Sequence, residues 1–233
     1  MMSSQASRLV VERHATPVRL GDQSLTRQDC TKYLGVLVDR HLQWDQQCLS
    51  VKKKINFGTC LINRAKDGLP EEMRVNLYRA FIEPHIDFCA PVWSATTETN
   101  VKLIESAQRN TLKAMADYCK AESMDQLFAK WDIEKVRSRW RRLDAQWLYK
   151  LRNLDKFPKV PDYLRTMLAV RTPIREPRTR KAAQKSNINA LVKTEGGKRL
   201  FCFRLWKSDL ELPKEVWNSS SLFMFQKAFL LAS

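Results

Sequence analysis

The hydrophobic pattern changes at residues 31–44, and this change constrains the fold more than any other feature of the chain. Before it, apolar residues come in short β-branched runs separated by turn residues; after it, they recur every three or four residues almost to the end. A period of two is typical of strands and a period near 3.6 of amphipathic helices. The sequence therefore predicts a mainly α protein with a small N-terminal antiparallel β-sheet, an α+β fold whose larger part is a helical bundle.

The β part is predicted from three apolar runs. Residues 8–12 form one strand, and residues 17–20 and 24–26 flank the turn signal Gly21-Asp22. Residues 33–38 are interpreted as a single buried strand, interrupted by Gly35, where a backbone or a ligand can approach closely. Asp39 ends this strand, and a helix is expected over about residues 42–65.

The helical part is predicted from buried stripes and caps. The first helix buries Trp44, Cys48, Val51, Ile55 and Ile62. Later helices are expected to bury Met73, Leu77, Ala80 and Phe81, then Ile86, Phe88, Val92 and Trp93, then Val101, Ile104, Ala107, Leu112 and Met115. Ser123 is expected to cap a short helix that buries Leu127, Phe128 and Trp131. In residues 133–152 the predicted stripe is Ile133, Val136, Trp140, Leu143, Trp147 and Leu151, and Ser219–Ser221 cap a terminal helix with Leu222, Phe225 and Phe229 inward.

The charge of the chain is strongly basic and unevenly distributed. The formal net charge is +16, and residues 165–207 contain twelve bases against two acids. Lys and Arg bind nucleic acids because they neutralise phosphates and release counterions. An excess that only keeps the protein soluble is the alternative, but the uneven distribution favours a polyanionic partner.

Several function classes lack their sequence signals. The six cysteines and three histidines have no zinc-ligand spacing, and the chain has no Asp-Asp pair, P-loop, nucleophile elbow or His-Glu-x-x-His. We therefore expect no catalytic residues and no metal or other cofactor in this chain. The absence of a signal peptide or a long apolar run leads us to expect an intracellular protein, nuclear or cytoplasmic, that is neither secreted nor bound to a membrane.

Three motifs together resemble one family. They are Lys-Tyr-Leu-Gly-Val, Asp and Leu-Gln-Trp within residues 31–44, the Leu-Tyr, Ile-x-Pro and Trp pattern within residues 77–93, and Gln108-Arg109-Asn110 within an apolar helix. In this order and spacing they resemble the part of non-LTR (LINE-type, jockey-like) retrotransposon reverse transcriptases that follows the active site. The likeness covers about residues 8–115, and residues 201–206, 212–213 and 225–229 match the end of the family more loosely.

The resemblance implies a domain organisation. Residues 8–40 would be the last palm strands, ending in the strand that holds the primer end. Residues 41–152 would be a helical, thumb-like bundle, and residues 153–233 a basic, partly extended region with a terminal helix. The family's catalytic Asp-Asp turn would lie before this chain, so that Mg²⁺ would belong to the missing palm.

The expected function is that of a C-terminal fragment of an RNA-directed DNA polymerase that is inactive alone and binds RNA and DNA without sequence preference. Its partners would be template–primer and the rest of a reverse transcriptase palm. The candidate nucleic-acid-binding residues are Tyr33, Leu34, Gly35, Val36, Lys53, Arg137, Arg141, Arg142, Arg175, Arg178, Arg180, Lys181, Lys198 and Arg199. The alternative is a helical, host-adopted interaction or scaffold protein without a nucleic-acid function.

Overall fold

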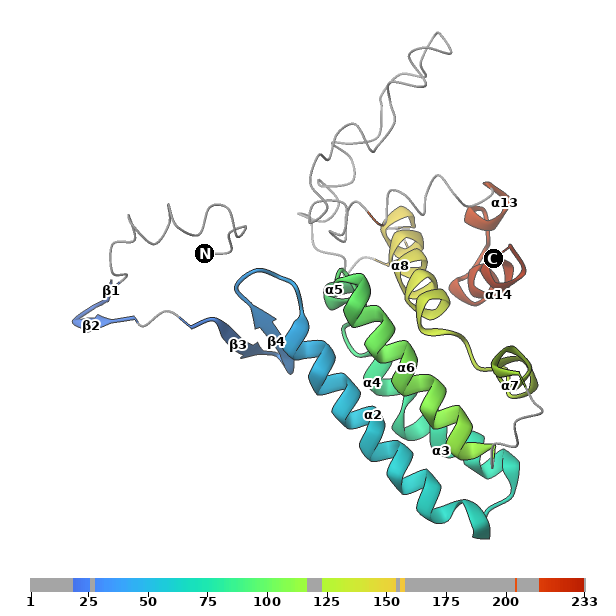
Figure 1. The fold of residues 1–233 in the computed structure, drawn as a ribbon. Coiled ribbons are helices and arrows are strands. Elements are labelled where there is room, and N and C mark those ends of the chain that lie inside the picture. The colour runs from blue at the N-terminus through green and yellow to red at the C-terminus, as the bar shows by residue number, and fades with distance from the viewer. Residues whose placement is uncertain are drawn as a thin grey trace. The chain divides into compact units, whose positions relative to one another are not determined.

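The computed structural model describes residues 19–25, 28–116, 123–153, 156–157, 204 and 214–232 (Figure 1). Contacts between residues divide the chain into an N-terminal unit, Met1–Val136, and a C-terminal unit, Arg137–Ser233. The fold is mainly helical with a small antiparallel β part, as the sequence predicts. The predicted strand over residues 8–12 lies outside the described residues, and the three-part domain organisation stays a prediction.

The β part consists of two separate hairpins. Strands β1 (Arg19–Leu20) and β2 (Gln23–Ser24) pair around the predicted turn, in which Gly21 has φ 60°. Strands β3 (Cys30–Tyr33) and β4 (Val36–Asp39) form the second two-stranded sheet. The predicted single buried strand over residues 33–38 is therefore wrong, because the chain reverses in its middle.

The second hairpin turns at Leu34 and Gly35. Their φ angles are 46° and 86°, and a two-residue type I′ turn needs a positive φ at both positions. Asn-Gly is the usual sequence of such a turn, so the apolar Leu34 made this segment resemble a continuous strand. A left-handed backbone costs a non-glycine residue roughly 1–2 kcal/mol.

The carboxylate of Asp39 organises the connection from β4 to helix α2 (Asp45–Ala65). It accepts backbone hydrogen bonds from His41 and Gln43 at 3.0 Å each and from Trp44 at 2.5 Å. The buried side chain of Gln47 on α2 accepts a hydrogen bond from the Leu37 amide at 2.9 Å. The hairpin is thus attached to the start of α2 by both its end and its outer edge.

Helices α2 and α6 (Glu98–Met115) run parallel to each other (Figure 1). Asn100 Nδ2 donates to Asp45 Oδ1 at 2.6 Å near the two N-termini, and the hydroxyls of Thr59 and Thr111 lie 2.6 Å apart further along. The segment that connects the end of α2 to the start of α6 consists of the 3₁₀ turn η1 (Lys66–Gly68) and helices α3 (Glu71–Phe81), α4 (Glu83–Asp87) and α5 (Ala90–Trp93). Helix α7 (Met124–Lys130) follows α6 and begins with a capping box at Ser123.

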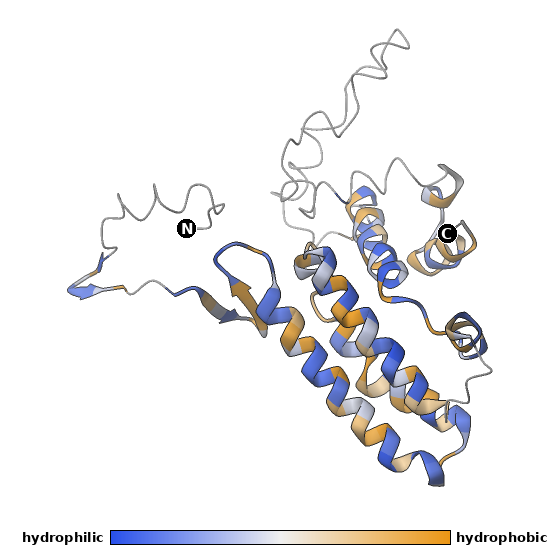
Figure 2. Cartoon of the chain, in the orientation of Figure 1, coloured by the Kyte–Doolittle hydropathy of each residue, from blue (hydrophilic) through white to orange (hydrophobic). Residues whose placement is uncertain are grey.

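The core of the N-terminal unit contains the predicted residues of α2, α6 and α7, and Figure 2 shows hydrophobic and hydrophilic positions alternating along α2 and α6. All the predicted apolar positions of α2 and α6 are buried, as are Leu127, Phe128 and Trp131. The prediction for α3 is wrong: Val75 and Tyr78 are buried, whereas Met73, Ala80 and Phe81 are exposed. In the segment that follows, Ile86 and Trp93 are buried as predicted, but Phe88 and Val92 are exposed.

The corrections in α3 have a common physical cause. Val75, Tyr78 and Ile82 repeat at three- and four-residue spacing, as the buried stripe of a helix must. The helix therefore carried a second apolar stripe, and packing selected this one. Phe81 and Phe88 remain on the surface as a result.

The C-terminal unit contains most of helix α8 (Val136–Arg152), together with α13 (Lys214–Trp217) and α14 (Leu222–Ala232). Tyr149 packs on Phe225 with ring centroids 4.7 Å apart and donates from its hydroxyl to the Ser219 carbonyl at 2.8 Å. Ser221 caps α14, and Phe225 and Phe229 are buried, as predicted.

Helix α8 departs from its predicted stripe in two ways. It begins at Val136 and not at Ile133, and Trp147 is exposed. The core of the C-terminal unit instead receives Ala145, Leu148 and Tyr149 beside Leu151. Among the described residues, no helix combines the length and the apolar character needed to cross a bilayer.

The turn of the second hairpin gives a stability prediction. Gly35→Ala should lower the free energy of unfolding by about 1–2 kcal/mol for its positive φ, and further because the new Cβ would lie 3.2 Å from two ring atoms of Phe88. Gly21→Ala is the matched control, since φ is also positive there but a Cβ added to Gly21 would have nothing within 4 Å. Urea unfolding measures both; an equal loss in the two variants would contradict the close packing of Gly35 on Phe88.

Candidate nucleic-acid interface

The tip of the second hairpin presents two of the predicted residues to solvent. The side chains of Tyr33 and Leu34 are 67% and 79% exposed. Gly35 lies against the ring of Phe88, and the side chain of Val36 is buried in the core. Tyr33 and Leu34 are therefore the side chains of this motif that a ligand can contact directly.

Lys53 lies on the outer face of α2. It and Lys54 are exposed, whereas Lys52 is half-buried. Consecutive helical residues point about 100° apart, so the three lysines cannot all face one phosphate backbone. The structure thus leaves Lys53 and Lys54 available on two adjoining sides of the helix.

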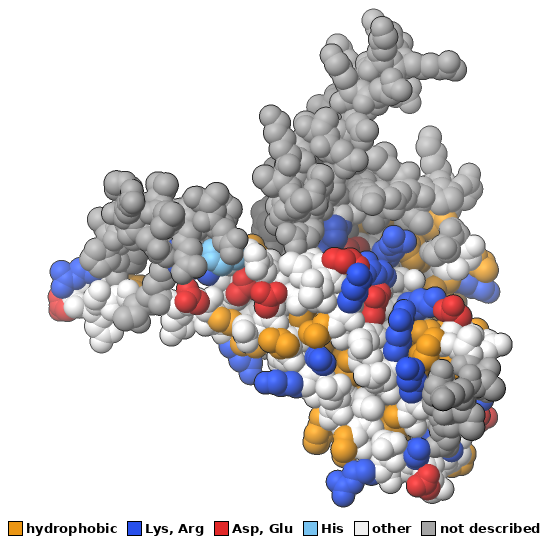
Figure 3. Space-filling view, in the orientation of Figure 1, with side chains coloured by type: hydrophobic (Ala, Val, Ile, Leu, Met, Phe, Trp, Pro, Cys, Tyr) orange, Lys and Arg blue, Asp and Glu red, His pale blue; other side chains and the backbone are white. Residues whose placement is uncertain are grey.

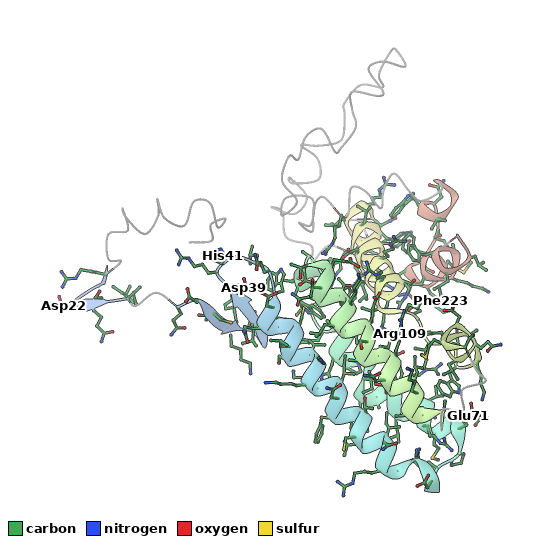
Figure 4. The ribbon with its side chains drawn as sticks, viewed as in Figure 1. Asp22, Asp39, His41, Glu71, Arg109 and Phe223 are labelled. Atoms are coloured by element: carbon green, nitrogen blue, oxygen red, sulfur yellow. The ribbon has the colours of Figure 1, made fainter. Side chains whose placement is uncertain are left out.

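A basic stripe on α6 was missed by the sequence analysis. It consists of Lys102, Arg109 and Lys113, which are exposed and lie seven and then four residues apart, on one face of the helix. Figure 4 shows the side chain of Arg109 on α6. Three acids lie near the stripe. Glu98 and Glu105 stand four residues before Lys102 and Arg109 on the same helix. The third is Asp125, whose pKa is lowered by its ion pair with Lys135 at 2.7 Å and, more weakly, by Arg109. The spacing was visible in the sequence, but the polar face of an amphipathic helix is usually only solvated.

Together α2 and α6 form a predominantly basic layer. They carry seven bases, which are Lys52, Lys53, Lys54, Arg64, Lys102, Arg109 and Lys113, against three acids, Asp45, Glu98 and Glu105. Asp45 and Glu98 stand in the first turns, where the helix dipole favours acids. Beyond the first turns the two helices carry the seven bases against one acid, Glu105, and Figure 3 shows blue side chains over this part of the surface.

The predicted arginines of α8 belong to the C-terminal unit. Arg137 and Arg141 are exposed and lie one turn apart on the same face, and Arg142 is half-buried. Asp144 is buried and forms an ion pair with Arg204, whose Nε lies 2.9 Å from Asp144 Oδ2. Burial outweighs the attraction of Arg204 and raises the pKa of Asp144 to about 6. Arg175, Arg178, Arg180, Lys181, Lys198 and Arg199 lie outside the described residues.

Acids and thiols of the described region have structural roles. The Asp39 carboxylate accepts hydrogen bonds from backbone amides. The Glu71 carboxylate forms an ion pair with Lys130 at 2.6 Å and accepts a hydrogen bond from the indole N–H of Trp131, and both interactions lower the pKa of Glu71. Burial raises the pKa of Cys48 to about 11, so its thiol is a poor nucleophile. Within the described ranges, no three His, Cys, Asp or Glu side chains gather in a way that could hold a metal ion.

Each motif segment contributes buried residues to the N-terminal unit: Val36 and Trp44 in the first, Tyr78 and Trp93 in the second, and Gln108 in the third. Gln108 Nε2 donates to the Tyr78 hydroxyl at 2.9 Å and to the Glu134 carbonyl at 2.8 Å, and Gln108 Oε1 accepts from the Val136 amide at 3.3 Å. The Gln43 carbonyl accepts from the Thr96 hydroxyl at 2.7 Å. The three segments that carry the family resemblance therefore pack into one core.

Comparisons of the chain with protein-family models, with curated proteins and with solved structures find no match. The candidate interface of the N-terminal unit therefore depends on the exposed residues of the hairpin tip and of the outer faces of α2 and α6, and the exposed arginines of α8 are a separate candidate in the C-terminal unit.

Gln108 gives a prediction about the core. Gln108→Ala should destabilise the N-terminal unit by about 2–3 kcal/mol, because buried polar groups of Tyr78, Glu134 and Val136 would lose their partner. Tyr78→Phe removes only one of these hydrogen bonds and should cost about 1 kcal/mol. Chemical denaturation measures both; equal losses would contradict the role of Gln108 as the shared partner.

Asp144 gives a prediction about pH. Because its pKa is about 6 in the folded protein and near 4 in an unfolded chain, the folded state holds the additional proton between these values. Its contribution to the free energy of unfolding should therefore fall as the pH rises from about 4 to about 6. Asp144→Asn should remove this dependence, whereas Asp125→Asn, at an exposed acid whose pKa is lowered, should keep it. Thermal unfolding across this pH range tests the prediction, and identical pH profiles of wild type and Asp144→Asn would refute it.

Proposed function

We propose that this chain is a C-terminal, thumb-containing part of a reverse transcriptase of the non-LTR retrotransposon type. Its role is to bind template–primer, RNA or DNA, without sequence preference and without performing the chemistry itself. Support comes from the packing of the three motif segments into a single core, which is expected if they are parts of one folded module. The catalytic acids and Mg²⁺ belong, in this proposal, to a palm that this chain joins in the nucleus or the cytoplasm.

The basic layer of α2 and α6 carries the proposal. Lys102 and Lys113 are eleven residues apart, so the stripe on α6 extends over about 16 Å of helix. This length matches several successive phosphates of one strand, which lie about 3.4 Å apart along a duplex axis. Long basic side chains on rigid helices bind phosphates and do not read base edges, which accounts for binding without sequence preference.

The hairpin tip supports a contact with the end of the primer. Leu34 has a left-handed backbone, yet its side chain is mostly exposed and so gains little from burial within this chain. Backbone strain that is not offset by packing within the chain is found mainly at ligand-binding positions. Gly35 gives the tip the tight turn that brings Tyr33 and Leu34 forward.

The stripe on α6 provides the test. In fluorescence anisotropy with an RNA–DNA hybrid, the triple variant Lys102→Ala, Arg109→Ala, Lys113→Ala should reduce the slope of log K against log salt by about 2–3. The matched control is Arg19→Ala, Lys156→Ala, Lys227→Ala, which removes the same charge from exposed positions outside the basic layer and should change the slope much less.

Three results would count against this proposal. If the wild-type affinity does not depend on salt, phosphate contacts do not drive binding. If the control loses as much as the stripe variant, binding follows net charge and not this surface. Magnesium-dependent primer extension by the purified chain would show that the catalytic part of the proposal is wrong.

A further inference from the structure

A second surface lies between α2 and the segment α3–α4, which run antiparallel. A Cβ added to Gly58 of α2 would lie 2.6 Å from Ile82 Cδ1 and 3.4 Å from the Phe81 carbonyl oxygen. One turn earlier on α2, Lys54 faces His85, whose pKa is lowered by burial and, more weakly, by the charge of Lys54. Residues 54 and 58 of α2 therefore lie beside residues 85 and 81 of the returning segment.

Large aromatic side chains are exposed along this surface. Phe57, Phe81 and Phe88 are 68%, 46% and 50% exposed. Phe81, His85 and Phe88 are spaced by four and three residues, which places them on one side of their segment, and Phe57 precedes Gly58 on the facing helix. We call Phe57, Phe81 and Phe88, with Lys53, Lys54 and His85, the aromatic track.

The aromatic track continues to the hairpin tip. The ring of Phe88 would lie 3.2 Å from a Cβ added to Gly35, and Tyr33 and Leu34 precede Gly35 at the exposed turn. The second surface is therefore continuous with the part of the candidate interface that the sequence predicts to meet nucleic acid. Figure 3 shows orange and blue side chains interspersed on the side of α2.

Exposed phenylalanines need an explanation because burying such a side chain contributes about 1.5–3 kcal/mol. Contiguous exposed apolar groups mark binding surfaces. In the described structure neither Lys53 nor Lys54 forms an ion pair, and the two acids of α4, Glu83 and Asp87, are half-buried and have interactions of their own. The track thus combines flat apolar rings with available positive charge.

We propose that the aromatic track binds single-stranded RNA or DNA, with bases stacked on Phe57, Phe81 and Phe88 and phosphates contacted by Lys53 and Lys54. This ligand is the one that offers both a polyanionic backbone and accessible aromatic faces, and single-strand-binding proteins combine stacking rings with basic side chains in this way. A duplex hides the faces of its bases and suits the basic stripe of α6 instead. The inference rests on the proposed nucleic-acid binding and specifies the strand type that this second surface takes.

The experiment compares two labelled probes by anisotropy: an oligothymidylate of about twelve nucleotides, within the range of single-strand sites, and a blunt duplex of the same length. Phe57→Ala, Phe81→Ala and Phe88→Ala should each weaken single-strand binding on the order of tenfold and leave duplex binding unchanged. Phe→Tyr at the same positions should retain binding, whereas Phe→Leu, which stays apolar but cannot stack, should not.

Met73→Ala and Phe223→Ala are the matched controls, since both remove exposed apolar side chains outside the aromatic track. They should leave both affinities unchanged. Thermal unfolding and gel filtration of every variant check that it folds and report its oligomeric state.

The outcomes separate this inference from the proposed function. If the track variants bind the single strand like wild type while the α6 triple variant loses duplex binding, the track proposal fails and the proposed function stands. If Phe→Leu binds like wild type, stacking is not the mechanism and the proposal is overturned. If the track variants change only the oligomeric state, the surface is a protein interface, and if wild type binds neither probe, both proposals fail.

Discussion

The N-terminal unit depends on how the start of α6 is attached to the loop before α2. The Thr96 hydroxyl donates to the Gln43 carbonyl, and Asn100 Nδ2 donates to the carboxylate of Asp45. These bonds set the two helices parallel and in register, and the hydroxyl contact of Thr59 with Thr111 maintains that register further along. Because parallel neighbours need a returning connection, the position of α3–α5 follows. Both candidate surfaces, the basic layer and the aromatic track, are consequences of this arrangement.

The buried residues of the three motifs have structural roles, whereas exposed ones such as Tyr33, Leu34 and Phe88 are among the residues that we expect to contact a ligand. Tyr78 and Gln108 share a buried hydrogen bond, and Trp93 donates from its indole nitrogen to the Phe88 carbonyl. Such residues maintain a fold because each buried polar group needs its partner. The motifs therefore support the proposed fold family more directly than the proposed binding.

The positions of the charged side chains on α2 and α6 and the exposure of Leu34 both follow from how helix ends and turns are capped. Two of the three acids of α2 and α6, Asp45 and Glu98, stand in the first turns, where they stabilise exposed amides. The helix bodies keep the bases, which extends a positive field along both axes. At the same end of the unit, the Asp39 carboxylate holds the loop by three amides and lets the hairpin present Leu34. Capping thus determines which side chains are left for a ligand.

The sequence alone determined the fold class, the turn at Gly21, the buried stripes of α2 and α6, and the cap at Ser123, because each depends on spacing within one element. It did not determine the turn at Leu34 and Gly35, the buried face of α3, or the start of α8 at Val136. At those places two local patterns were compatible with the residues: Leu34 fits a strand as well as a turn, and α3 carries two apolar stripes. Only contacts with other elements decide between them, such as Gly35 against Phe88 and Gly58 against Ile82. Phe81 is exposed for this reason, because packing one apolar stripe of α3 into the core leaves the other stripe on the surface.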